Sequence, residues 1–160
     1  MRGRPGGPVL LMSGPVLVGA YAAVNYAAIR AASGAQRSGS GRVTPDGLTS
    51  LGVDVWWVVK GVTLVVGFAA LAVAVVGLLL RRRGRGRSFL LVLAGVPIVP
   101  YALGIAVAFA NPVPWMATFY RSPDFAAALP SWQPASALIL LAAALAQAAG
   151  ALWRRRPAEP

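Results

Sequence analysis

Residues 61–80, GVTLVVGFAALAVAVVGLLL, contain no Asp, Glu, Lys or Arg, and this stretch decides the fold. At a rise of about 1.5 Å per residue, a helix of this length matches the hydrocarbon core of a bilayer, which is about 30 Å thick. Backbone N–H and C=O groups find no water in that core, so a crossing segment must satisfy them internally, as a helix does. We therefore expect a transmembrane helix over Gly61–Leu80.

Three further stretches lack charge in the same way. They hold 21, 21 and 18 residues and are Val9–Ile29, Phe89–Phe109 and Ser136–Trp153. Together the four stretches make up half of the 160-residue chain, so all 19 charged residues fall in the other half. The sequence predicts an all-α polytopic membrane protein, a single four-transmembrane-helix bundle spanning residues 1–160, with short interfacial helices in its outer loops.

The composition excludes several classes of protein. The chain is 58% hydrophobic and only 12% charged, about half the charge of a soluble domain. Its net charge of +11 does not indicate nucleic acid, because the positive residues flank apolar spans and form no water-facing basic surface. Neither Cys nor His is present, which excludes disulfides and disfavours zinc sites, His-ligated haem and Cys or His catalysis.

The arginines predict the orientation. Ten of the 15 positive residues fall in Met1–Pro8, Arg81–Ser88 and Arg154–Pro160, and the longer connections 30–60 and 110–135 hold the other five. The positive-inside rule then places both termini and the loop 81–88 in the cytoplasm, at the plasma membrane. The arginines expected to contact anionic lipid there are Arg81, Arg82, Arg83, Arg85, Arg87, Arg154, Arg155 and Arg156.

The N-terminal segment has a second interpretation. Two arginines, an apolar run and the pair Ala20 and Ala22 also resemble a secretory signal peptide, whose cleavage would leave three helices. Pro15 interrupts the run, however, and the apolar residues continue to Ile29. These two features favour a first transmembrane helix.

Prolines and a few polar residues interrupt the spans. Pro15 predicts a kink whose freed carbonyl a neighbouring helix satisfies, and Pro97 with Pro100 predicts a bend or a local unwinding near the middle of the third span. The candidate polar positions inside the bundle are Asn25, Tyr101 and Gln147. We expect Gln147 to form a hydrogen bond to another helix. A polar cavity joining all three would indicate a transport path.

The two outer connections are expected to differ in character. Ala31–Gly41 is predicted as a flexible loop and Thr44–Leu51 as a short interfacial helix. An outer-interface belt follows at Trp56, Trp57 and Lys60, where the lysine either snorkels to the headgroups or serves as a buried ion site; the adjacent tryptophans favour the former.

The connection 110–135 combines aromatic residues with five prolines. Ser122 and Pro123 predict the start of a short helix over Pro123–Leu129. We expect the segment to lie on the outer leaflet or over the mouth of the bundle. Its candidate partner or lipid contacts are Trp115, Phe119, Tyr120, Arg121, Asp124, Phe125 and Trp132.

Small residues recur every four positions on two of the spans. They are Gly19, Ala23 and Ala27 in the first span and Ala142, Ala146 and Gly150 in the fourth. Such faces allow two helices to approach closely, either within the bundle or between two membrane proteins.

The sequence offers little catalytic chemistry. No two of its four acids form a close pair, and neither a phosphate-binding loop nor a nucleophile motif is present, so we expect no enzyme, cofactor or metal site. The favoured hypothesis is a bacterial accessory, scaffold or assembly subunit that binds another membrane protein or a second copy. The alternatives are a small oligomeric channel or transporter and, third, an outer-leaflet lipid-binding protein or enzyme, which convergence of Asp46, Asp54 and Asp124 would support.

Overall fold

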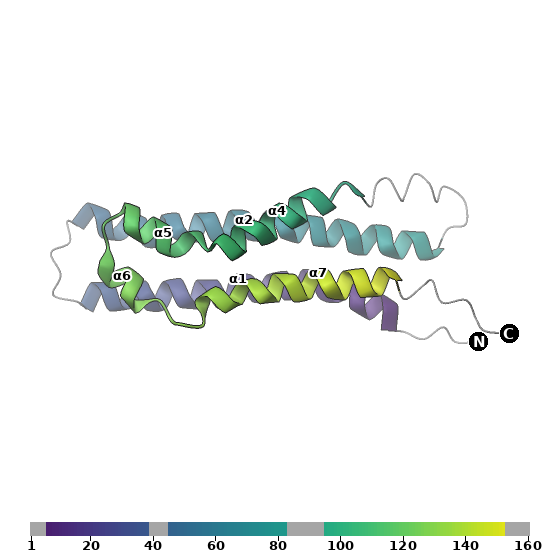
Figure 1. Ribbon diagram of the computed structural model, residues 1–160, viewed down its shortest axis with the longest axis horizontal. Coiled ribbons are helices and arrows are strands. Elements are labelled where there is room, and N and C mark those ends of the chain that lie inside the picture. Colours follow the sequence, from purple (N-terminus) through teal and green to yellow (C-terminus); the bar gives the residue numbers. More distant parts are fainter. Residues whose placement is uncertain (1–5, 39–44, 83–94, 153–160) are drawn as a thin grey trace.

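The computed structural model describes residues 6–38, 45–82 and 95–152 (Figure 1). Within these ranges every regular element is a helix and no strand occurs, which confirms the all-α prediction. The helices are α1 (Gly6–Ser38), α2 (Pro45–Arg82), α4 (Ile98–Ala110), α5 (Pro112–Phe119), α6 (Pro123–Ala128), the 3-10 helix η1 (Gln133–Ser136) and α7 (Ala137–Leu152).

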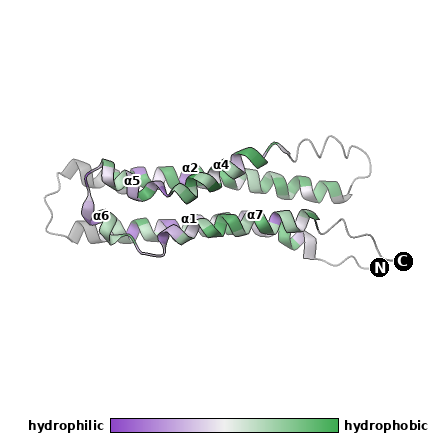
Figure 2. Ribbon diagram, viewed as in Figure 1, coloured by the Kyte–Doolittle hydropathy of each residue, from purple (hydrophilic) through white to green (hydrophobic). Residues whose placement is uncertain are grey.

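Several of these helices fit a membrane protein, as expected. Gly6–Gly34, Leu51–Leu80 and Gln133–Leu152 are each long and apolar enough to cross a bilayer. Helices α4 and α5, bent by 56° at the break between them, would make a fourth crossing if the pair is one span. Apolar residues dominate the middle of each long helix (Figure 2).

The long helices run alternately up and down. Helix α1 packs against α2 and α7, and α2 also packs against α4 (Figure 1). Helix α6 contacts both α1 and α5, so it joins the two layers of the bundle toward the end opposite the start of α1. The start of α1, the end of α2 and the end of α7 all lie at one end.

The connection 30–60 is more helical than predicted. Helix α1 continues to Ser38, so the flexible loop expected over Ala31–Gly41 is wrong for residues 31–38, while residues 39–44 lie outside the described part. The expected interfacial helix is instead the first turns of α2. No proline interrupts residues 46–82, and packing of α1 on α2 fully buries Ala32 and Leu51. This contact stabilises the extension of both helices.

The helix of the third predicted span is interrupted at Pro97, and a larger bend follows at its far end. Val96 and Pro97 form a turn, and α4 begins directly after it with Pro100 in its first turn, where a helix does not need the missing N–H. Because Gly95, directly before this turn, is helical as well, the helix is interrupted at Pro97, which agrees with the predicted local unwinding; residues 89–94 lie outside the described part. The 56° bend is at Asn111, which the sequence did not indicate.

Close helix contacts occur at glycines, among them Gly150 of the predicted small residues. A Cβ on Gly104 of α4 would lie 2.1 Å from Val66 Cγ2 of α2, and one on Gly150 of α7 would lie 3.0 Å from the Leu10 Cβ of α1. The buried face of α7 comprises Ala137, Leu140, Ala143, Gln147 and Gly150, whereas Ala142 is exposed. The residues Gly19, Ala23 and Ala27 are also exposed, on the outside of α1.

Candidate functional site

Four polar side chains from separate parts of the chain form one network around Asn25. The Asn25 Nδ2 donates hydrogen bonds to Ser136 Oγ (2.9 Å) and to its own helix at Tyr21 O (3.0 Å). The Gln133 Nε2 donates to Asn25 Oδ1 (2.9 Å) and to Asn111 Oδ1 (3.1 Å), and Asn111 Nδ2 donates back to Gln133 Oε1 (2.9 Å). The network joins α1, the α4–α5 break and η1.

The local sequence explains how Asn111 reaches this network. Its φ of 47° is left-handed, a conformation that Asn tolerates better than most residues, and this residue ends α4. Pro112 then starts α5 at the position where a helix does not use its N–H. The left-handed residue and the proline together produce the bend, and the amide pair with Gln133 ties that bend to η1.

The polar side-chain atoms of the network form hydrogen bonds mainly with one another. The side-chain oxygens and nitrogens of Asn25, Gln133 and Asn111 all have partners, and Asn25, Gln133 and Ser136 are buried. A buried amide that lost its partner would destabilise the fold by about 1–3 kcal/mol. The arrangement therefore cross-links helices and leaves these amides little capacity to bind a ligand.

A second polar contact compensates for Pro15. This proline has no N–H to donate to Leu11 O, and Gln147 of α7 supplies the missing donor: its Nε2 lies 3.1 Å from Leu11 O and 2.8 Å from Ala70 O of α2. Gly14 leaves the necessary room, since a Cβ there would lie 2.3 Å from Gln147 Cδ. The predicted interhelical hydrogen bond of Gln147 is confirmed. The prediction that a neighbouring helix satisfies the carbonyl freed by Pro15 is confirmed as well.

The three candidate polar positions do not form one cluster. Asn25 and Gln147 belong to the two separate networks, and the Tyr101 hydroxyl of α4 is buried without a hydrogen-bond partner. Asn111, Gln133 and Ser136 were not among the site residues predicted from the sequence. The available indication was a short run of amide and hydroxyl side chains beside prolines in otherwise apolar sequence.

The outer aromatic segment is exposed in part. Trp115 and Phe119 of α5 are 69% and 82% exposed, and Trp132, Arg121 and Asp124 are exposed as well. Phe125 is fully buried, so its prediction as an outer-surface contact is wrong. The reason is that α6 packs on α1 and turns Phe125 into the core.

Tyr120 connects this segment to α2. Its hydroxyl donates a 2.5 Å hydrogen bond to Asp54 Oδ2. The bond raises the pKa of the Tyr120 phenol, because ionisation would remove the donor and place a second negative charge beside the carboxylate. One of the three acids considered for an outer site, Asp54, is thus already bonded, and the described residues contain no group of three potential metal ligands.

The predicted outer-interface residues lie on the surface of α2. Trp56 packs edge-to-face on Tyr26 of α1 with 5.0 Å between ring centroids. The Lys60 Nζ lies 4.4 Å from the ring centroid of Trp57, and both side chains are exposed. This geometry fits a snorkelling lysine. Of the predicted lipid-contacting arginines, Arg81 and Arg82 end α2 and the other six lie outside the described residues.

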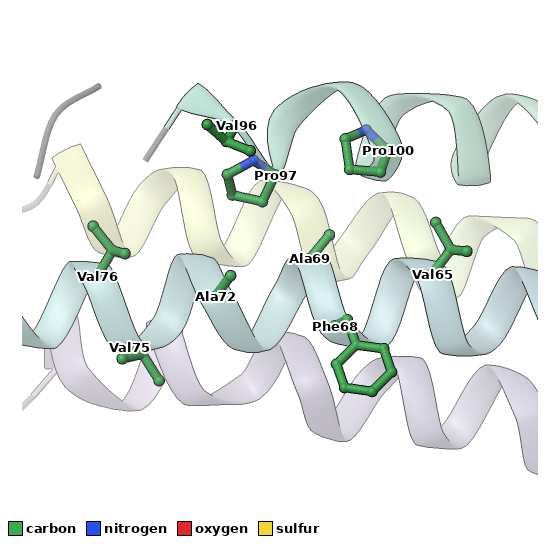
Figure 3. Close-up of a pocket in the computed structure, with 9 residues that line it drawn as sticks. All are labelled: Val65, Phe68, Ala69, Ala72, Val75, Val76, Val96, Pro97 and Pro100. Carbon is green, nitrogen blue, oxygen red and sulfur yellow. The ribbon is translucent and has the colours of Figure 1, made fainter. Parts of the chain in front are cut away.

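A groove between α2 and α4 has no polar lining. Its volume is about 590 Å³ (Figure 3). The residues that line it are Val65, Phe68, Ala69, Ala72, Val75, Val76, Val96, Pro97 and Pro100. Such a surface accommodates apolar groups and provides no acid, base or nucleophile.

The Asn25 network predicts a specific loss of stability. Replacing Asn25→Leu would leave Gln133 Nε2 and Ser136 Oγ each without one partner, and we expect the free energy of unfolding to fall by about 1–3 kcal/mol. Unfolding in detergent, followed by circular dichroism, measures the change. The matched control is Thr63→Val, because Thr63 Oγ1 bonds only within its own helix, at Val59 O. Equal effects of the two substitutions would contradict the cross-linking role.

If Gln147 replaces the backbone donor that Pro15 lacks, substitutions at these two positions should not be additive. The substitution Gln147→Met removes the donor for Leu11 O, and we expect it to destabilise the bundle by about 0.6–2 kcal/mol. In a Pro15→Ala background the helix supplies its own N–H to Leu11 O, so the same substitution should cost less. Unfolding of the four variants measures the difference. An undiminished effect in the Pro15→Ala background would show that Gln147 does not compensate for the proline.

Comparison with known proteins gives this chain no relatives. No protein-family model matches it, and neither a curated protein nor a solved structure does.

Proposed function

We propose that the chain is a non-enzymatic, four-span membrane protein that acts as an accessory or assembly subunit. The observation that carries the proposal is the contrast between its interior and its surface. Two sets of buried amides are engaged in linking the helices, whereas large aromatic side chains of α5 are left exposed. A protein whose function is to bind a partner needs a stable fold and an exposed binding surface.

The proposed recognition surface consists of Trp115 and Phe119. Aromatic side chains contribute much of the binding energy at protein interfaces. The exposed small residues Gly19, Ala23 and Ala27 of α1 offer a second place where the helix of another protein or of a second copy could pack closely. Both features suit a membrane-protein partner or a homo-oligomer.

In the proposed topology both termini face the cytoplasm at the plasma membrane. The start of α1 and the ends of α2 and α7 share one end of the bundle (Figure 1), and in the sequence each of these helix ends is next to one of the three arginine-rich segments. This clustering supports the orientation given by the positive-inside rule. Anionic lipid at that surface would attract each arginine by about 1 kcal/mol.

A small oligomeric channel or transporter is the second candidate. The buried Tyr101 Oη and Gln147 Oε1 have no hydrogen-bond partner, and unsatisfied polar groups inside a bundle can line a path for a polar solute. Purified protein in liposomes that released a trapped ion or small solute would favour this candidate over the accessory role.

The topology proposal predicts the result of reporter fusions. A reporter active only in the cytoplasm should be active when fused after residue 84 and inactive when fused after residue 130. A periplasmic reporter at the same two positions should show the opposite pattern. Activity of the periplasmic reporter at residue 84 would overturn the orientation.

The recognition surface predicts the behaviour of an aromatic variant. After purification from native membranes in mild detergent, we expect Phe119→Ala to lower the yield of the co-purifying partner or second copy several-fold. Phe68→Ala is the matched control, since Phe68 of α2 is also an exposed phenylalanine, at 71%. A monomer without any partner, or equal losses with both variants at equal abundance, would contradict the proposal.

A further inference from the structure

Two buried polar atoms in the described part of the bundle lack a hydrogen-bond partner. They are the Tyr101 hydroxyl of α4 and the Gln147 Oε1 of α7. Tyr101 is 7% exposed and Gln147 is 2% exposed, so bulk solvent does not satisfy either atom. An unpaired polar group in such a setting is costly, and native proteins usually supply it with a partner.

The packing of α2 places the two residues at one level of the bundle. Gly104 of α4 lies directly against Val66 of α2, and Gln147 reaches Ala70 O of the same helix. Helices α2 and α4 run in opposite directions (Figure 1), so Tyr101, three residues before Gly104, lies opposite the turn that contains Ala70. This register places the Tyr101 backbone opposite the turn of α2 whose carbonyl, Ala70 O, Gln147 reaches.

The side-chain direction of Tyr101 supports the same placement. Long side chains on a helix usually point back toward its N-terminus, which for Tyr101 is the direction of Arg82 along α2. The Ala70 carbonyl points the same way, because helix carbonyls point toward the C-terminus. Gln147 extends from α7 into the space between α1 and α2, where its Nε2 bonds Leu11 O and Ala70 O. Helices α4 and α7 also contact each other directly.

The chemistry of the two atoms is complementary. A phenol hydroxyl donates one hydrogen bond and accepts others, while the amide oxygen only accepts. We propose that one water molecule is bound between them, accepting from Tyr101 Oη–H and donating to Gln147 Oε1. Buried waters in proteins make two to four such bonds to groups that would otherwise be unsatisfied. The nearby Val66 and Ala70 carry only apolar side chains, so the site suits a small neutral molecule better than an ion.

The first test is a double-mutant cycle on the whole chain in detergent. Tyr101→Phe and Gln147→Met each remove one side of the site with little change of shape. Either substitution alone should remove the benefit of the water, so the double variant should be less destabilised than additivity predicts, with an unfolding constant at least about threefold below the additive value. The control cycle pairs Tyr101→Phe with Asn25→Leu, which lies in the other network, and should be additive.

The second test detects the water itself. X-ray radiolysis in ¹⁸O-labelled water oxidises side chains next to bound water, and we expect Tyr101 to be labelled in the unmodified chain and several-fold less in Gln147→Met. Tyr21, which is buried to a similar degree, serves as the reference. Labelling together with coupling supports the site. Coupling without labelling would indicate a direct Tyr101–Gln147 bond and overturn the water, and an additive cycle would overturn the link between the two residues.

Discussion

The need to satisfy polar groups in an apolar interior is the constraint on which this bundle depends. Pro15 removes a backbone donor from α1, and the left-handed Asn111 ends the hydrogen-bond ladder of α4. An amide side chain from another segment bonds at each interruption: Gln147 donates to the freed Leu11 carbonyl, and Gln133 pairs with the Asn111 side chain. Because both amides come from the C-terminal part of the chain, η1 and α7 are linked to the Pro15 region of α1 and to the bend between α4 and α5.

Much of the fold could be predicted because the length and the lack of charge of each apolar stretch can be read directly from the sequence. A charge-free stretch such as Gly61–Leu80 has few alternatives to a membrane-spanning helix. The pairing of Gln147 with another helix was also predictable, since an amide inside an apolar span must find a partner. In contrast, the helical extensions over residues 31–38 and 45–51 depend on the packing of Ala32 and Leu51, which pattern alone does not show.

The candidate site was only partly predictable. Asn25 was identified because it is a polar residue inside a span, but its partners Asn111 and Gln133 lie among prolines in a segment expected outside the bundle. Their role depends on the left-handed conformation of Asn111 and on the 3-10 helix η1, which are far apart in the sequence and come together only in the folded chain. The prediction of Phe125 as an outer-surface contact was wrong for a related reason. An apolar residue in a short helix is compatible with either the surface or the core, and the contact of α6 with α1 places this one in the core.

The bend at Asn111 connects the interior network to the proposed recognition surface. Helix α5 leaves the axis of α4 by 56°, and this change of direction determines where Trp115 and Phe119 stand. At its far end, the bond from Tyr120 to Asp54 ties the segment to α2. Side-chain contacts therefore fix the direction of α5 at both ends, one of them part-buried and the other exposed. A change that releases Asn111 from Gln133 should alter the aromatic surface without touching it, so a loss of partner binding in such a variant would follow from the same geometry that stabilises the fold.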